Sequence, residues 1–200
     1  MQKKVNVRWL AVTAILGAVA AVLMMLSISV PLIPSFVKLD FSELPALIAS
    51  FALGPVSGVV VCLLKNLVNL PTSYSAGIGE LCNFLLGVAF VVPAGLFYKF
   101  KKDRWGALWG SLLGALVMAI ASFPINYCIT YPFYIQSGIM SLDAILDAYQ
   151  LILPSVETLP QALWIFNAPF TFFKALCDVA ITFLVYKHLS PLLHGSGRGA

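Results

Sequence analysis

Lys174 lies in the middle of the last long apolar segment of the sequence. A charged side chain inside a membrane-spanning segment is costly, and such residues commonly face a polar cavity or a ligand. Asp178 follows four residues later on the same helix face, so neutralisation by this carboxylate is an alternative explanation. Both explanations can hold together, because a partly balanced lysine still has ammonium hydrogens to donate. The chemistry indicated is hydrogen-bonded binding of a ligand.

Polar side chains precede Lys174 at helical spacing. Thr171 lies three residues before it and Asn167 seven residues before it, so the three side chains form a stripe on one helix face. In the preceding segment, Asn126 offers a further amide. Aromatic residues are frequent in the same parts of the sequence: Phe41, Phe84, Phe123, Tyr127, Tyr131, Trp164, Phe166 and Phe170. A few fixed donors between aromatic walls suit a planar heteroaromatic ligand, although each aromatic residue taken alone is as well explained by packing in the core or against lipid.

A second group of charges lies in the stretch from Val37 to Pro71, next to apolar sequence. Lys38, Asp40 and Glu43 come close together, and Lys65 follows within the apolar part. Charges in such surroundings need a partner or a solvated cavity. The sequence therefore predicts a polar site here. The alternative is a loop at the membrane surface whose charges face water.

The composition is that of an integral membrane protein. Of the 200 residues, 60% are hydrophobic and 10% are charged, and the mean hydropathy is +0.95. A soluble domain has about 25% charged residues. The net charge of +4 comes from basic residues beside apolar segments, where they act as topology signals and do not indicate a nucleic-acid surface.

The sequence contains no familiar catalytic or metal-binding motif. Its cysteines, Cys62, Cys82, Cys128 and Cys177, are far apart without a CxxC pair, and there is no HExxH, GxSxG or Walker A motif. Both histidines lie near the C-terminus. We therefore predict a protein that is not an enzyme, has no metal site and does not itself hydrolyse ATP by the usual route.

The apolar segments predict an all-α integral membrane protein with six transmembrane helices. Their approximate bounds are Arg8–Val30, two short helices within Glu43–Leu70, Glu80–Phe100, Trp105–Tyr134 and Pro160–His188. The Gly54-Pro55 pair separates the two short helices. With six spans, the basic residues near the N-terminus, those at positions 99–104 and Lys187 all fall on the cytoplasmic side, as do both termini.

Two further features complete the predicted organisation. Residues 141–150 predict a short amphipathic helix at the outer interface. In the first segment, Ala14 with Ala18 and Gly17 with Ala21 have small-xxx-small spacing on one face, which lets another helix approach closely, either from a partner or from the same chain. The chain is predicted as one domain, residues 1–194, with a flexible tail at residues 195–200.

Several blocks of the sequence resemble one known family. The blocks are KLDFSELPALIASFALGPVSGVVVCLLKNLV, GIGELCNFLLG, APFTFFKAL and VYKHLSPLL. They resemble the riboflavin-specific S components of energy-coupling factor (ECF) transporters, and the likeness extends from Trp9 to Leu193. The resemblance implies a pocket near the outer face that binds one vitamin, with Pro31–Phe41 as the covering loop. It also implies that Ala14 and Ala18 dock the transmembrane T component, which works with two cytosolic ATPase subunits in the bacterial plasma membrane.

The resemblance also implies binding residues. Lys174 matches the lysine of the family's Asn-x-x-Lys motif, Asn126 matches an asparagine of helix five, and Thr171 stands where asparagine is expected. Threonine keeps one donor and one acceptor but lacks the two donors of an amide. The full set of predicted substrate-binding residues is Lys174, Thr171, Asn126, Asn167, Asn83, Glu80, Leu39, Asp40, Phe41 and Tyr127.

The predicted function is the capture of riboflavin for ATP-driven uptake, with no cofactor and with FMN as a further candidate ligand. Two alternatives stay open. One is an S component for another vitamin, such as pantothenate or a pterin, and the other is a structural membrane subunit without a ligand. The buried lysine and its polar stripe argue against the structural subunit, although a buried ion pair can serve assembly alone.

Overall fold

The computed structural model describes the backbone of residues 7–194 and the side chains up to residue 185. The predicted tail at 195–200 and the side chains of Lys3, Lys4 and Lys187 lie outside this range. The helices are α1 (Val7–Met25), α2 (Glu43–Leu53), α3 (Pro55–Asn69), α4 (Ile78–Phe100), α5 (Arg104–Ile125), α6 (Tyr131–Gln136), α7 (Leu142–Gln150), α8 (Leu159–Ala162) and α9 (Ala168–His194). The π-helical turns η2 (Asn126–Thr130) and η3 (Leu163–Asn167) join α5 to α6 and α8 to α9, and the 3₁₀ turn η1 (Leu70–Thr72) follows α3.

Long apolar helices dominate the described chain. Five helical stretches are long and apolar enough to cross a membrane: Val7–Met25, Pro55–Thr72, Ile78–Phe100, Arg104–Gln136 and Leu159–Val185. The predicted apolar helices at these positions are confirmed. The remaining apolar helix, α2, has only 11 residues, because Gly54 at φ 100° ends it and Pro55 begins α3.

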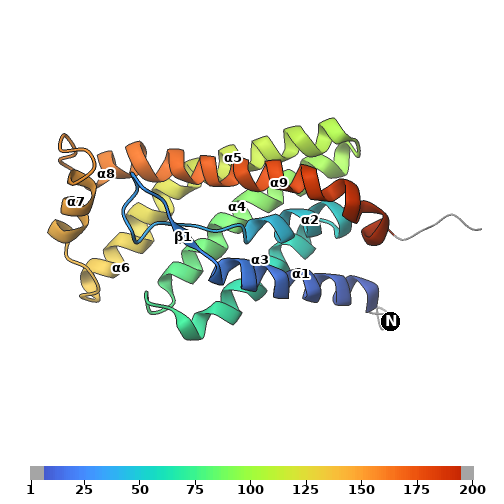
Figure 1. The fold of residues 1–200 in the computed structure, drawn as a ribbon, viewed down its shortest axis with the longest axis horizontal. Helices are drawn as coiled ribbons and strands as arrows, with labels where there is room; N and C mark the ends of the chain where they lie inside the picture. The colour runs from blue at the N-terminus through green and yellow to red at the C-terminus, as the bar shows by residue number, and fades with distance from the viewer. Residues whose placement is uncertain (1–6, 195–200) are drawn as a thin grey trace, which may run out of the picture.

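The long helices pack around a buried apolar cluster to which α2, α3, α4, α5 and α9 all contribute, and a second buried cluster lies among α6, α7, α8 and η3. Glycines of α5 let it approach the backbone of α4 closely. A Cβ atom on Gly114 would collide with the carbonyl oxygen of Phe90, and one on Gly110 would lie 2.8 Å from that of Ala94. In Figure 1 the start of α1, the α4–α5 connection and the end of α9 lie at one end of the bundle, and α6 and α7 lie at the other.

The small residues of α1 divide between two faces. Gly17 and Ala21 are buried, and a Cβ atom on Gly17 would lie 2.8 Å from the side chain of Leu64 in α3. Ala14 and Ala18 are exposed. The prediction of a single small-residue face is therefore wrong, because one pair packs inside the bundle and the other faces away from it.

The connection from α1 to α2 contains a short antiparallel hairpin that the sequence did not predict. Strand β1 (Ile28–Ser29) pairs with β2 (Lys38–Leu39), with Ile28 opposite Leu39 and Ser29 opposite Lys38. Asp40 follows β2 directly. The hairpin thus sets the position of the charged residues that lead into α2.

Candidate ligand-binding site

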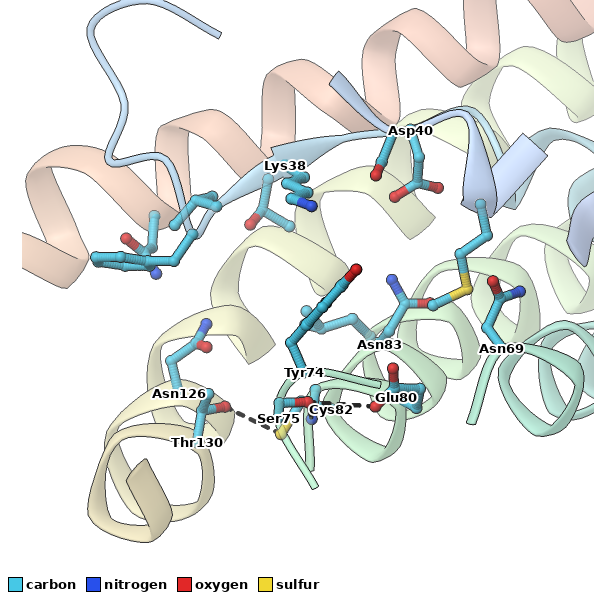
Figure 2. Close-up of a pocket in the computed structure, with 18 of the residues that line it drawn as sticks. Lys38, Asp40, Asn69, Tyr74, Ser75, Glu80, Cys82, Asn83, Asn126 and Thr130 are labelled. Carbon is cyan, nitrogen blue, oxygen red and sulfur yellow. Dashed lines mark hydrogen bonds between the residues drawn. The ribbon is translucent and has the colours of Figure 1, made fainter. Parts of the chain in front are cut away.

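A cavity of about 860 Å³ opens between the α1–α2 connection and the helices that it covers. Side chains from α3, α4, the Arg104–Gln136 helix and α9 complete its lining. Figure 2 shows Lys38 and Asp40 on the hairpin side, with Tyr74 and Asn83 opposite them. Small-molecule sites commonly enclose about 300–1,000 Å³, so this cavity has the size of a site for a vitamin-sized ligand.

Lys174 lines the cavity but its carboxylate partner is not the predicted one. Its Nζ donates a hydrogen bond to Oδ2 of Asp40 at 2.8 Å, and both side chains are almost completely buried. Asp178 is fully buried, and neither of its carboxylate oxygens has a hydrogen-bond partner among the described residues. The alternative in which Asp178 forms the ion pair with Lys174 therefore does not hold, since Asp40, a loop residue far away in the sequence, takes that place.

Asp40 is held on both of its carboxylate oxygens. Oδ1 accepts hydrogen bonds from the backbone N–H of Ser42, at 3.0 Å, and from the Ser42 hydroxyl, while Oδ2 faces Lys174. Burial alone would raise the pKa of the Asp40 carboxyl, but the ammonium groups of Lys174 and Lys65 outweigh burial and lower that pKa to about 2. Asp40 is therefore a fixed anion beside the ligand cavity.

A second ion pair lies behind the first. Lys65 Nζ is 2.6 Å from Oε2 of Glu43, both side chains have no exposed surface, and the same ammonium donates to the hydroxyl of Ser42 at 2.6 Å. The alternative of a surface loop with solvated charges is thus wrong for Asp40, Glu43 and Lys65, whereas Lys38 is exposed as that alternative expected. Each of the two buried lysines is therefore paired with a carboxylate, Lys174 with Asp40 and Lys65 with Glu43.

Thr171 and Asn167 line the cavity on the same face of the helix as Lys174, as the predicted stripe required. Asn167 belongs to a buried network: the hydroxyl of Tyr149 donates to its Oδ1 at 2.6 Å, and its amide nitrogen donates to the hydroxyl of Tyr131 at 3.3 Å. The two tyrosine hydroxyls are themselves 2.6 Å apart. Burial raises the pKa of Tyr149, which keeps its hydroxyl a donor.

The predicted amphipathic helix at residues 141–150 exists as α7, and its apolar face carries Tyr149 into this network. The role of Tyr149 was not predicted, because a tyrosine on an apolar helix face is typical of a packing residue. Its phenol fills the core, and its hydroxyl bonds to Asn167, a residue of the cavity wall.

Asn126 is the first residue of the π-helical turn η2, and Asn167 is the last residue of the π-helical turn η3. Both asparagines line the cavity. A π-helical turn carries one residue more than an α-helical turn, and it is often found at functional sites. The amide nitrogen of Asn126 donates to the carbonyl of Ser122 at 2.8 Å, which leaves its second N–H and its amide oxygen for a ligand.

Asn83 and Glu80 lie on the first turns of α4 and line the opposite side of the cavity. Glu80 accepts hydrogen bonds from the hydroxyls of Ser73, at 2.6 Å, and Ser75, at 3.3 Å. The amide oxygen of Asn83 has no partner among the described residues. This side therefore offers a fixed carboxylate and an unused acceptor.

Three of the predicted binding residues do not line the cavity. Leu39 is buried as a strand residue of the hairpin, Phe41 is half-buried, and Tyr127 is 43% exposed. The ring of Tyr127 stacks on Phe123, which also stacks on Trp164. Tyr127 instead lines a separate apolar groove between α6, α7 and α8.

Other residues of the cavity were not in the set of predicted substrate-binding residues. Lys38 lies 6.0 Å from the ring centroid of Tyr74, a side chain that is 93% exposed, and both line the cavity. Thr130 donates to the sulfur of Cys82 at 3.0 Å, also in the wall. The polar loop at residues 71–79 was a visible signal for Tyr74. Within the described part of the chain no group of His, Cys, Asp and Glu side chains is arranged to hold a metal ion.

Comparison with known proteins identifies the family. Residues 8–186 match the family described as the ECF transporter, substrate-specific component. The chain is an ECF substrate-specific component. Its long apolar helices agree with this assignment, and it is a multi-pass protein of the bacterial plasma membrane.

Individual known proteins are similar to this chain over most of their length. The riboflavin transporter RibU of Staphylococcus aureus is 30% identical over 180 residues, which cover 90% of this chain and 89% of that protein. The riboflavin transporter FmnP of Bacillus subtilis is 29% identical over 189 residues, covering 93% and 94%. A solved S component of a bacterial ECF transporter superposes with a TM-score of 0.72 at 28% identity, covering 94% of this chain and 98% of that structure.

Proposed function

We propose that this ECF substrate-specific component captures riboflavin and delivers it to a T component driven by two cytosolic ATPase subunits. The observation that carries the ligand assignment is the lining of one cavity, which includes the ammonium of Lys174, the hydroxyl of Thr171 and the amide of Asn126. Similar proteins named as riboflavin transporters support it. Riboflavin is here the transported ligand and not a cofactor, and FMN is a second ligand to test.

The ring of riboflavin matches the donors and acceptors of this wall. The uracil-like edge of an isoalloxazine ring alternates carbonyl acceptors with one N–H donor. Lys174 offers ammonium hydrogens, Thr171 a hydroxyl, and Asn126 both an N–H and an amide oxygen. Glu80 and Asn83, across the cavity, offer acceptors to the hydroxyls of the ribityl chain.

We further propose six spans with the termini in the cytoplasm and the cavity near the outer face. The start of α1, the α4–α5 connection and the end of α9 share one end of the bundle (Figure 1). Lys101, Lys102 and Arg104, in and beside that connection, are exposed, and basic residues favour the cytoplasmic side. The short helix α2 would be the remaining span, with local thinning of the bilayer to match its length.

The exposed pair Ala14 and Ala18 on α1 is the proposed docking face for the T component. Small side chains let a second helix approach closely in a membrane. The pair is free for this role because Gly17 and Ala21, not Ala14 and Ala18, pack on α3.

The test is a titration of the detergent-purified protein with riboflavin, followed by flavin fluorescence. The wild-type protein should quench the flavin fluorescence, and the quenching should saturate at about one flavin per chain, as expected for a single enclosed site. Lys174→Met should weaken binding strongly. Lys101→Met, which removes an exposed cation away from the cavity, is the matched control and should bind like wild type.

Two outcomes contradict the assignment. Unchanged binding by Lys174→Met would remove this lysine from the site. Failure of folded wild type to bind riboflavin or FMN, together with saturable binding of pantothenate or a pterin, would assign the cavity to that vitamin instead.

A further inference from the structure

A chain of hydrogen bonds leads from the cavity into the core of the protein. It begins at Lys174, whose ammonium donates to Asp40 at 2.8 Å, and it continues from Asp40 to the hydroxyl and the backbone N–H of Ser42. The hydroxyl of Ser42 accepts from Lys65 at 2.6 Å, and Lys65 is paired with Glu43 at 2.6 Å. Two lysines and two carboxylates thus form one connected, charge-balanced group.

The two ends of this chain of hydrogen bonds have different access to a ligand. Lys174 and Asp40 line the cavity, whereas Ser42, Glu43 and Lys65 have no exposed surface and do not line it. A ligand in the cavity therefore cannot touch the inner three. Any effect that they have on binding must pass through Asp40 and Lys174.

We propose that Asp40, Ser42 and the Glu43–Lys65 pair are positioning residues, which hold the ammonium of Lys174 where a flavin ring meets it. This inference rests on the proposed function, in which Lys174 binds the ring. A lysine side chain has a flexible four-carbon stem and a strongly hydrated ammonium. Fixing it before the ligand arrives lowers the ordering cost of binding.

Asp40 is occupied in a way that favours positioning over direct ligand contact. Its Oδ2 faces Lys174, and its Oδ1 already accepts two hydrogen bonds from Ser42. If the charge of Asp40 is removed, the carboxylate of Asp178 remains near Lys174, one turn further along α9 and outside the cavity lining. The ammonium is then drawn towards a group that does not face the ligand.

Asp40 also belongs to the segment that covers the cavity, because it follows strand β2 of the hairpin. Lys174 is therefore held only while that segment is in place. The position of the cover and the position of the binding lysine are coupled through one ion pair.

The experiment compares two ligands across four variants. The ligands are riboflavin and lumiflavin, which has the flavin ring without the ribityl chain. Ser42→Ala keeps every charge and removes only the hydroxyl link; Asp40→Asn keeps the shape and removes the charge; Asp40→Glu restores the charge on a longer side chain. Thr13→Val is the matched control, because it also removes one buried side-chain hydrogen bond, to Ser57, away from the cavity.

We expect Ser42→Ala and Asp40→Asn to weaken both flavins by the same factor, about five- to tenfold for Ser42→Ala and tenfold or more for Asp40→Asn. Asp40→Glu should bind more tightly than Asp40→Asn, and Thr13→Val should bind like wild type. A role in packing alone predicts the reverse order for the two Asp40 variants, since asparagine conserves the shape and glutamate does not. Thermal unfolding of each variant establishes that it is folded.

Three results overturn the inference. The first is normal binding by Ser42→Ala. The second is weakened riboflavin binding with unchanged lumiflavin binding, which places Asp40 on the ribityl chain. The third is an Asp40→Glu variant that binds worse than Asp40→Asn. If folded wild type binds neither flavin, the proposed function itself fails and this inference falls with it.

Discussion

The ammonium nitrogen of Lys174 and a carboxylate oxygen of Asp40 lie 2.8 Å apart, although 134 positions separate the two residues in the chain. One belongs to the helix that carries the polar stripe, and the other follows the hairpin that covers the cavity. The pair therefore joins the cover of the site to its wall. Its behaviour with pH can be tested directly.

Acid should remove the stabilisation that Asp40 provides. The pKa of its carboxyl is lowered from 3.8 to about 2 in the folded protein, so the stabilisation is complete above about pH 4 and is lost as the pH falls towards 2. It amounts to at most about 2 kcal/mol. Unfolding of wild type and Asp40→Asn in detergent should show a difference that shrinks across this window. A difference that stays constant from pH 6 to pH 2, roughly, would contradict the lowered pKa.

Bulky substitution on the exposed face of α1 should separate binding from transport. Ala18→Trp should leave flavin binding unchanged and abolish uptake by cells that contain the T component and ATPases, because the indole blocks close helix approach. Gly17→Trp is the matched control one residue earlier. Its side chain would collide with Leu64, so it should lower thermal stability. Normal uptake with Ala18→Trp would move the docking face elsewhere.

Removal of the Tyr149 hydroxyl should destabilise the fold. Tyr149→Phe leaves the amide oxygen of Asn167 buried without its donor, which costs about 1–3 kcal/mol of unfolding free energy. Thermal unfolding measures the change. Tyr127→Phe, which alters a 43% exposed side chain and keeps the ring that stacks on Phe123, should unfold like wild type. Equal stability of all three proteins would mean that the network adds nothing.

Replacement of Thr171 by asparagine should preserve flavin binding or tighten it. The side chain lines the cavity beside Lys174, and an amide adds a donor towards the ring. One added hydrogen bond corresponds to an affinity gain of up to about tenfold. Equilibrium titration with riboflavin measures it. A strong loss of affinity in a folded Thr171→Asn protein would show that the wall is shaped around threonine.

Local signals predicted the helices of this protein well. The Gly54-Pro55 break and the apolar face of α7 are both set by residues close in sequence, and both are confirmed. The hairpin was not predictable, because strands of two residues carry no periodic pattern. The helical segments were therefore predictable from the sequence, and the hairpin within the connection that covers the cavity was not.

The site was predicted in part. Helical spacing correctly placed Thr171 and Asn167 in the same wall as Lys174. The predicted set of binding residues failed at Tyr127, because successive residues of a helix point about 100° apart, and only Asn126 of that neighbouring pair reaches the cavity. The ion partner of Lys174 differs from the one suggested by the sequence, Asp178, for another reason. A rule for residues four apart favours Asp178, whereas the actual partner depends on how the whole chain folds.

The two π-helical turns that carry Asn126 and Asn167 have a consequence for how such a site can change. A turn of this kind is an α-helical turn with one residue inserted. Deleting a residue from Asn126–Thr130 or Leu163–Asn167 would remove this extra residue and restore α-helical winding, while the flanking helices keep the faces that they bury. The bundle would keep its helices while the amides at the cavity changed direction. A single-codon insertion or deletion is thus a short mutational route from one ligand preference to another on an otherwise unchanged scaffold.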